Sequence, residues 1–306
     1  MIDLKSRLAV ILVVFFLPWI TSSQSKPSYS VKILGVVQDG GLPHLGNNKT
    51  CCENIQQNKY VTSIMLINNE NNESYLFDAS PDINEQLNFM GDRIKTDLKG
   101  IFLTHAHIGH YTGLMYFGRE ALNSKSINVY AMPRMKRFLE DNGPWSQLVS
   151  LKNILIKEIN NNSKLSVDPH IIIQPIEVPH RAEFSETVGY IIHGPNKKLL
   201  FIPDIDKWYL WDKSIIDEIK KVDYALLDAT FYDEKEINYR DISEIPHPFV
   251  IESLELFKNL KLKEKKKIYF IHLNHTNPLL HSDSDEYKNL ISKGFNVANE
   301  GLELKL

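Results

Sequence analysis

The stretch THAHIGHYTG, residues Thr104–Gly113, is the most informative part of this chain. It holds three histidines within six residues, directly after the apolar run at 101–103. Side chains alternate in an extended segment, so His105 and His107 can face one centre, while His110 starts the next helix and can reach a neighbouring position. Imidazole is a common ligand of zinc and similar ions. We therefore predict a metal site here; the alternative is that these histidines cap a helix and bond to backbone.

Other short apolar runs in the chain also end directly in an aspartate or a histidine. Such runs are typical of buried strands, and ligands gather beyond the carboxyl ends of strands in sheets that helices cover. The residues at these further strand ends are Asp78, His180, Asp204, Asp228 and His272. Together with His105 they favour one shared site over six unrelated structural roles.

Helical patterns lie between the predicted strands, which indicates a layered α/β architecture. The asparagine-rich turn at 68–72 separates apolar runs at 63–67 and 74–77, and this arrangement predicts an early β-hairpin. The predicted helices cover residues 82–90, 110–121, 132–142, 215–220 and 248–260.

Length and charge exclude some classes of function. The 306 residues suit one large domain or two small ones. The net charge of −3 gives no electrostatic case for a nucleic-acid partner. The lysines at 261–267 have acidic neighbours, and we interpret them as a solvated helix end. A small-molecule substrate is the expected partner.

The first residues have the layout of a secretory signal peptide. Lys5 and Arg7 precede an uncharged apolar run at 8–20, and small residues follow at 21–23. A bilayer span needs about 20 apolar residues, and this run is shorter. We predict a signal peptide at 1–23 and a periplasmic or secreted mature protein without a stable membrane span; an uncleaved anchor is the alternative.

The only cysteines, Cys51 and Cys52, are adjacent in the sequence. Neighbouring cysteines rarely bridge each other, because disulfide geometry needs a larger separation of the Cα atoms. We therefore expect no disulfide framework despite export, and we interpret the pair as loop thiols.

The histidine motif resembles the His-x-His-x-Asp-His signature of the metallo-β-lactamase superfamily. This resemblance extends over nearly all of the mature chain, and it implies a four-layer αββα sandwich for residues 30–306. Within the superfamily the chain most resembles the family of pyrroloquinoline quinone biosynthesis protein B, through segments Gln38–Gly41, Pro203–Asp206 and His272–Pro278. It is similar, more distantly, to the ribonuclease Z and cyclic phosphodiesterase branch.

The resemblance implies a set of metal ligands. A first ion would be held by His105, His107 and His180, and a second ion by His110 and His272, with Asp204 as the bridge between them. Asp78 would support the histidine loop through hydrogen bonds.

One position departs from the family pattern. Gly109 stands where the family has an aspartate ligand, so we expect a second ion to bind weakly. The first site keeps three histidines and an open position for water, as catalytic zinc sites do. We therefore predict one firmly held Zn²⁺, with iron or manganese as alternatives, unless His275 compensates for Gly109. The segment Asp39–Gly41, near His44, is predicted to form a tight turn at the mouth of the site.

The catalytic expectations follow from this ligand set. Zinc can lower the pKa of a bound water to about 7. Asp204 would orient this water and take part in proton transfer. His247 would donate the proton to the leaving group, as a histidine does in the ribonuclease Z branch, unless it only caps a helix. Asp228 would support a metal-bound histidine unless it only caps the strand end, and His275 would line the site unless it only bonds to turn backbone.

The predicted function is that of an exported metal-dependent hydrolase that uses a metal-activated water. Phosphodiester, ester and lactone substrates fit this machinery, and His247 favours phosphodiesters. Two alternatives are an oxidative or quinone-binding role like that of the quinone-biosynthesis family, and a metal-binding module without catalysis.

Overall fold

The computed structural model describes residues 28–46, 59–89, 98–237 and 245–306. The predicted signal peptide at 1–23 and the two cysteines lie outside these ranges. Within the described ranges, no helix combines the length and the apolar character that crossing a bilayer requires.

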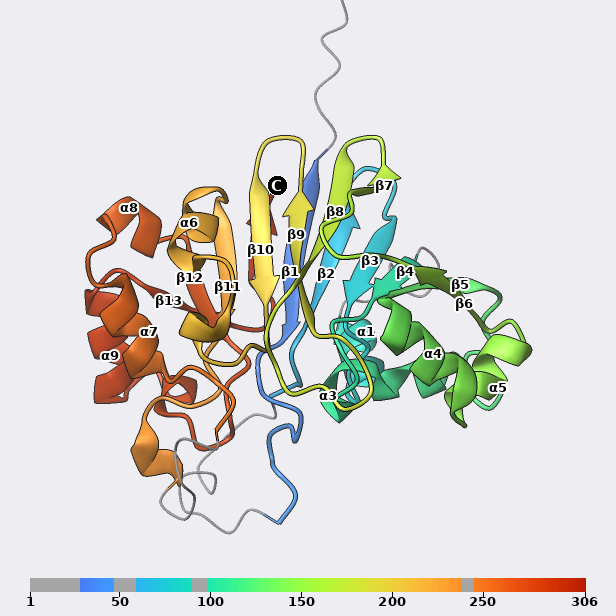
Figure 1. Cartoon of the computed structure of the whole chain (residues 1–306), viewed down its shortest axis with the longest axis horizontal. Coiled ribbons are helices and arrows are strands. Elements are labelled where there is room, and N and C mark those ends of the chain that lie inside the picture. Colours follow the sequence, from blue (N-terminus) through green and yellow to red (C-terminus); the bar gives the residue numbers. More distant parts are fainter. Residues whose placement is uncertain (1–27, 47–58, 90–97, 238–244) are drawn as a thin grey trace, which may run out of the picture.

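Two mixed sheets form the centre of the molecule (Figure 1). The first has the strand order β14-β1-β2-β3-β4-β5-β6, and the second has the order β13-β12-β11-β10-β9-β8-β7. Strands of the first sheet are β1 (Tyr29–Gly35), β2 (Ser63–Asn68), β3 (Ser74–Phe77), β4 (Leu98–Phe102), β5 (Ile127–Ala131), β6 (Ile154–Glu158) and β14 (Glu303–Lys305). Strands of the second are β7 (Leu165–Asp168), β8 (Ile171–Glu177), β9 (Val188–His193), β10 (Lys198–Ile202), β11 (Tyr224–Asp228), β12 (Ile268–Ile271) and β13 (Asn296–Val297).

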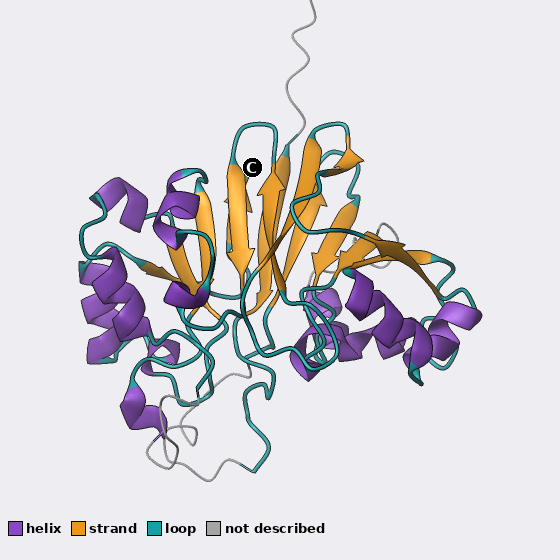
Figure 2. Ribbon diagram, viewed as in Figure 1, coloured by secondary structure: helices purple, strands orange, loops and turns teal. Residues whose placement is uncertain are grey.

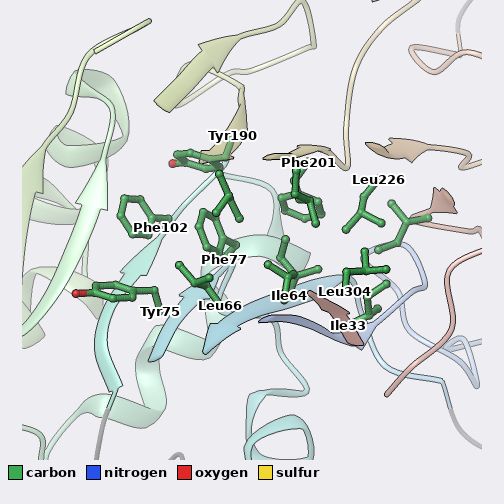
Figure 3. Close-up of a cluster of buried hydrophobic side chains, with 14 of the residues drawn as sticks. Ile33, Ile64, Leu66, Tyr75, Phe77, Phe102, Tyr190, Phe201, Leu226 and Leu304 are labelled. Atoms are coloured by element: carbon green, nitrogen blue, oxygen red, sulfur yellow. The ribbon is translucent and has the colours of Figure 1, made fainter. Parts of the chain in front are cut away.

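The main hydrophobic core lies between the two sheets (Figure 3). Phe77 and Phe102 of the first sheet stack with ring centroids 5.0 Å apart, and Tyr190 of the second sheet meets Phe102 at 5.6 Å. All of β3 is buried, as expected for a strand with both faces covered. This packing holds the two sheets face to face, so that their strand ends can meet at one edge.

Helices cover the outer face of each sheet (Figures 1 and 2). A second apolar cluster joins the first sheet to α1, η2, α4 and α5, and a third joins the other sheet to α6, α7 and α9. The helical elements are α1 (Ile83–Phe89), α3 (Ile108–Tyr111), η2 (Thr112–Phe117), α4 (Pro133–Asp141), α5 (Trp145–Ser150), η3 (Trp208–Leu210), α6 (Ile215–Lys220), η4 (Glu234–Ile237), α7 (Val250–Phe257), α8 (Leu262–Lys265), η6 (Pro278–Leu280) and α9 (Asp285–Ser292). The predicted four-layer αββα sandwich is confirmed.

One predicted helix is wrong in its form. The helix expected at 110–121 is instead the short α3 followed by the 3₁₀ helix η2. The Gly113 amide donates to the Ala79 carbonyl at 2.9 Å, and the Ala79 amide donates to the His110 carbonyl, also at 2.9 Å. Because Gly113 bonds to the loop after β3, it cannot continue the α-helical ladder. These two hydrogen bonds hold the histidine loop against the end of β3.

Candidate metal centre

The strand ends of both sheets bring several groups of ligand atoms together, two of which share no residue. His105, His107 and His180 form one group, in which the ligand atoms lie within 4.8 Å of one another. Asp39, His110 and His272 form the other, within the same limit. We call these the first and second half-sites.

Asp204 lies between the two half-sites. Its Oδ2 is 2.9 Å from His110 Nε2, 3.2 Å from His272 Nε2 and 3.7 Å from His105 Nε2. Its Oδ1 is 3.7 Å from His180 Nε2. One carboxylate therefore faces both half-sites, which is the geometry that a bridging ligand needs.

The converging atoms have no hydrogen-bond partner outside the group of ligand atoms. They are the Nε2 atoms of His105, His107, His110, His180 and His272, with Asp39 Oδ1 and Asp204 Oδ2. Buried polar atoms are normally paired, so such a group facing one point fits a metal ion. The donor set of imidazole and carboxylate suits zinc, iron and manganese.

The opposite ring nitrogens of four of these histidines are held in place. The Nδ1 atoms of His105, His110, His180 and His272 contact, in that order, Thr104 Oγ1 (3.0 Å), Asp78 Oδ2 (2.7 Å), Asp206 Oδ1 (3.0 Å) and Thr230 Oγ1 (2.9 Å). Metal-ligating histidines usually have such partners, which fix the ring so that Nε2 faces the ion.

Burial and nearby charges shift the pKa values of these histidines in different directions. Burial lowers the pKa of His105 well below its usual value and that of His107 to about 4, so both are neutral and able to ligate. Burial alone would also lower the pKa of His110, but Asp78, Asp204 and Asp39 raise it well above the usual value. A cation in the second half-site would displace this His110 proton.

Asp78 supports the histidine loop, as the sequence suggested. Its carboxylate accepts the Thr104 amide at 2.8 Å and the Thr104 hydroxyl at 2.9 Å, besides its contact with His110. The residue is fully buried, and its φ of 65° lies in the left-handed region. Strained residues at a site persist only where the surroundings hold them firmly.

Replacing Asp78 with alanine should therefore destabilise the protein strongly. The Thr104 amide and His110 would lose a buried acceptor, and breaking a buried charged pair costs about 3–5 kcal/mol. Urea unfolding of the metal-free protein measures the loss. Asp78→Asn keeps the shape and tolerates the left-handed backbone, so it should lose less. A loss for alanine below about 1 kcal/mol would contradict this role.

Asp228 lies at the end of β11 and acts differently from the expectation. It does not contact a histidine of either half-site directly. Its Oδ1 accepts the Thr230 hydroxyl at 2.7 Å, and that hydroxyl contacts His272. Its Oδ2 lies 2.8 Å from His247 Nδ1. Asp228 thus supports His272 through Thr230 and holds His247 directly.

His247 lies beside the two half-sites, and with His180 and Asp204 it forms a further group of potential ligand atoms. Its Nδ1 is 3.7 Å from Asp204 Oδ1, and its ring centroid is 5.2 Å from that of His180. Burial alone would lower the pKa of His247, but the Asp228 carboxylate raises it above the usual value. A protonated histidine held at this distance can serve as a proton donor.

Asp39 is the functional candidate that sequence reasoning missed. The predicted turn is present, since the Gly41 amide donates to the Gln38 carbonyl at 2.9 Å and Gly41 has a φ of +67°. However, the turn also directs Asp39 into the second half-site, with Oδ1 3.2 Å from His110 Nε2. The spacing of the sequence gives no signal for this contact, because Asp39 and His110 are far apart in the chain.

His275 lies outside both half-sites. Its ring stacks on that of His44, with centroids 4.1 Å apart. The structure therefore does not bring His275 into the ligand clusters to replace the missing aspartate at Gly109. Asp206 and Thr230, which hold His180 and His272, were not predicted either.

Comparisons with known proteins agree with this geometry. The sequence profile described as "Beta-lactamase superfamily domain" matches residues 73–273. Coenzyme PQQ synthesis protein B from Methylococcus capsulatus is 26% identical over 312 residues, covering 90% of this chain and 99% of that protein. The protein of the same name from Acinetobacter baumannii (strain AB0057) is 26% identical with the same coverage.

Solved structures give the same fold. Zn(2+)-bound PqqB from Methylobacterium extorquens superposes with a TM-score of 0.74 at 22% identity, covering 90% of this chain and 100% of that one. A diphosphatase from the PhnP family follows, with a TM-score of 0.66 at 18% identity and coverage of 91% and 97%. The profile match spans most of the chain, and the two facing sheets carry the ligand clusters at their edge, so this chain belongs to the beta-lactamase superfamily and has the metallo-β-lactamase fold.

Proposed function

We propose that this protein is a metal-dependent hydrolase that acts on a small phosphodiester. The observation that carries the proposal is the pairing of Asp204 with His247 at one centre. Asp204 faces both half-sites, and His247 Nδ1 lies 3.7 Å from its Oδ1. This proximity supports a role for Asp204 as the base and for His247 as the acid of one proton-transfer reaction.

A metal ion in the half-sites would activate a water molecule and polarise the electrophile. The chain's own residues do the rest. Asp204 accepts a hydrogen bond from the attacking water and orients it. His247 donates its proton to the leaving oxygen, and the Asp228 carboxylate keeps the ring in position and stabilises its charged form. Both groups are buried, so bulk water competes little with these contacts.

Phosphodiesters fit this arrangement best, because their leaving oxygen needs a proton and their charged oxygens suit a cationic centre. Among proteins with similar folds, the diphosphatase of the PhnP family and human tRNase Z, short form, carry names that refer to phosphorus–oxygen bond cleavage. Hydrolysis of esters and lactones would use the same residues, but it would depend less on His247.

The direct test is hydrolysis of bis(p-nitrophenyl) phosphate beside p-nitrophenyl acetate and a simple lactone. We expect the metal-loaded protein to cleave the phosphodiester, to lose this activity with a chelator and to regain it with Zn²⁺ or Mn²⁺. Cleavage of the lactone alone would assign the enzyme to another substrate class. Failure on all three substrates with a fully loaded centre would contradict hydrolysis.

A second candidate function follows from the sequence relatives. The similarity to Coenzyme PQQ synthesis protein B extends over 90% of this chain. It supports an oxidative or quinone-binding role for the same centre. Oxygen consumption by the iron-loaded protein with a quinone precursor, without hydrolysis of any ester tested, would favour this candidate.

We also propose that the protein is exported and acts on a small molecule. The charged start, the apolar run at 8–20 and the small residues at 21–23 support export. Mass spectrometry of protein recovered from the cell envelope or the medium should find a mature N-terminus near Gln24. An intact N-terminus in the cytoplasmic fraction would contradict export.

A further inference from the structure

We propose that Asp39 supplies the carboxylate ligand that Gly109 cannot, so that the second half-site binds its own divalent cation. The resemblance to the superfamily places an aspartate at the position of Gly109. The half-site would otherwise have only His110, His272 and the shared Asp204. The ligand is thus provided by a turn after β1 instead of by the histidine motif.

The position of the Asp39 carboxylate carries this inference. Its Oδ1 lies 3.2 Å from His110 Nε2 and 3.9 Å from His272 Nε2. The side chain is 17% exposed, and Oδ1 itself is buried without a hydrogen-bond partner. The Asp39 carboxylate thus faces two imidazoles, and Oδ1 has no partner outside the half-site.

The backbone around Asp39 is fixed to the strand end that carries His272. Val37 forms bridges to both Val61 and Leu273, and the Gln38 amide donates to the Leu273 carbonyl at 2.9 Å. Leu273 directly follows His272 in the chain. The turn therefore has a fixed position relative to the second half-site, and Asp39 does not reach it from a free loop.

A side chain at position 109 and the Asp39 carboxylate would occupy the same space. A Cβ atom at Gly109 would lie 2.2 Å from Asp39 Oδ1 and 2.9 Å from Asp39 Cα. No side chain fits there while the turn keeps its place, because real Cβ atoms do not approach other atoms so closely. The glycine at 109 therefore allows the close approach of Asp39, whose carboxylate lies in the space that a side chain at 109 would need.

Metal stoichiometry tests this exchange directly. We expect the metal-free wild-type protein to take up about two Zn²⁺ ions on reconstitution, as two-metal sites do. Asp39→Ala should take up about one, because it keeps only the three-histidine site. Gly109→Asp alone should take up about one ion and unfold at lower temperature than the wild type.

Asp39→Asn provides a test that keeps the shape of the turn. Competition titration should show a Kd for the second ion raised by more than the about 10–100-fold that loss of a supporting residue causes. Asp217→Asn, which removes an exposed carboxylate on α6, is the matched control and should leave both ions bound. Two ions retained in Asp39→Ala, or a single ion in the wild type, would overturn the proposal.

These readouts do not depend on turnover. The inference concerns the same centre as the proposed hydrolysis, but it predicts ion binding in the absence of substrate. A protein that binds two ions and hydrolyses nothing would contradict the proposed function and leave the role of Asp39 intact. A protein that hydrolyses the substrate and keeps two ions without Asp39 would support the proposed function and contradict the role of Asp39.

Discussion

Replacing His107 with alanine should reduce phosphodiester hydrolysis by more than the about 100-fold that loss of a supporting residue costs a metal site. The first half-site would keep only His105, His180 and the Asp204 carboxylate that it shares with the second half-site. The ion there would lose one of the three imidazoles that a catalytic zinc site uses to hold it. The His107 side chain is 13% exposed and forms none of the main core contacts, so its loss should spare the fold.

Two measurements separate a lost ion from a lost fold. Elemental analysis of His107→Ala should find the first ion missing, while thermal unfolding of the metal-free variant should match that of the metal-free wild type. His170→Ala, which truncates an exposed histidine between β7 and β8, is the matched control and should keep both metal and activity. If His107→Ala bound no metal at the first half-site and still hydrolysed the substrate at the wild-type rate, metal-dependent catalysis would be the wrong account.

The ligands at strand ends could be predicted from the sequence because they obey local rules. An apolar run followed by His105, Asp204 or His272 indicates a buried strand that delivers a polar side chain to one edge of its sheet. The structure brings all of the predicted metal ligands to that edge, from both sheets. The layered α/β architecture follows from the same alternation of strands and helices, whereas the four-layer αββα form was implied by the resemblance to the superfamily. The helix boundaries are close to those expected for α1, α4 and α6.

Asp39 could not be predicted in this way. It follows β1, but its neighbours Gly40 and Gly41 favour a turn, and a turn alone does not show what its side chains face. Its approach to His110 depends on the bridges of Val37 to Val61 and Leu273, which are contacts between distant parts of the chain. The motif alone shows only that Gly109 has no side chain. A prediction from the motif therefore treats this ligand as lost, although the fold supplies a carboxylate from Asp39.

The failure to predict the short α3 has a related cause. The apolar spacing after His110 favours a longer helix, but the Gly113 amide is bonded to Ala79 across the loop. This tertiary hydrogen bond outweighs local helix propensity, which is a weak preference of below about 1 kcal/mol per residue. The early end of α3 keeps the histidine loop against β3, where Asp78 can contact both Thr104 and His110.

Replacing His247 with alanine should lower kcat about 10²–10⁴-fold for a phosphodiester with an alkyl leaving group, the range that a positioned acid provides. The same variant should lose far less activity towards bis(p-nitrophenyl) phosphate, because p-nitrophenolate is a stable anion and leaves without a proton. The contrast follows from the proposed role of the residue: Asp228 holds His247 Nδ1 at 2.8 Å, and the other ring nitrogen would donate the proton.

The two substrates act as each other's control in this experiment. Equal losses with both would mean that His247 positions the substrate or the centre and does not donate a proton. Unchanged rates with both would remove it from the reaction altogether. The unfolding temperature of His247→Ala should fall, because the buried Asp228 carboxylate loses its His247 partner. Metal content is measured beside each rate, because His247 also forms a group of potential ligands with His180 and Asp204. A steeper dependence of the rate on leaving-group pKa in His247→Ala than in the wild type is therefore the result that assigns proton donation to this histidine, because only the variant must expel the leaving group as a bare anion.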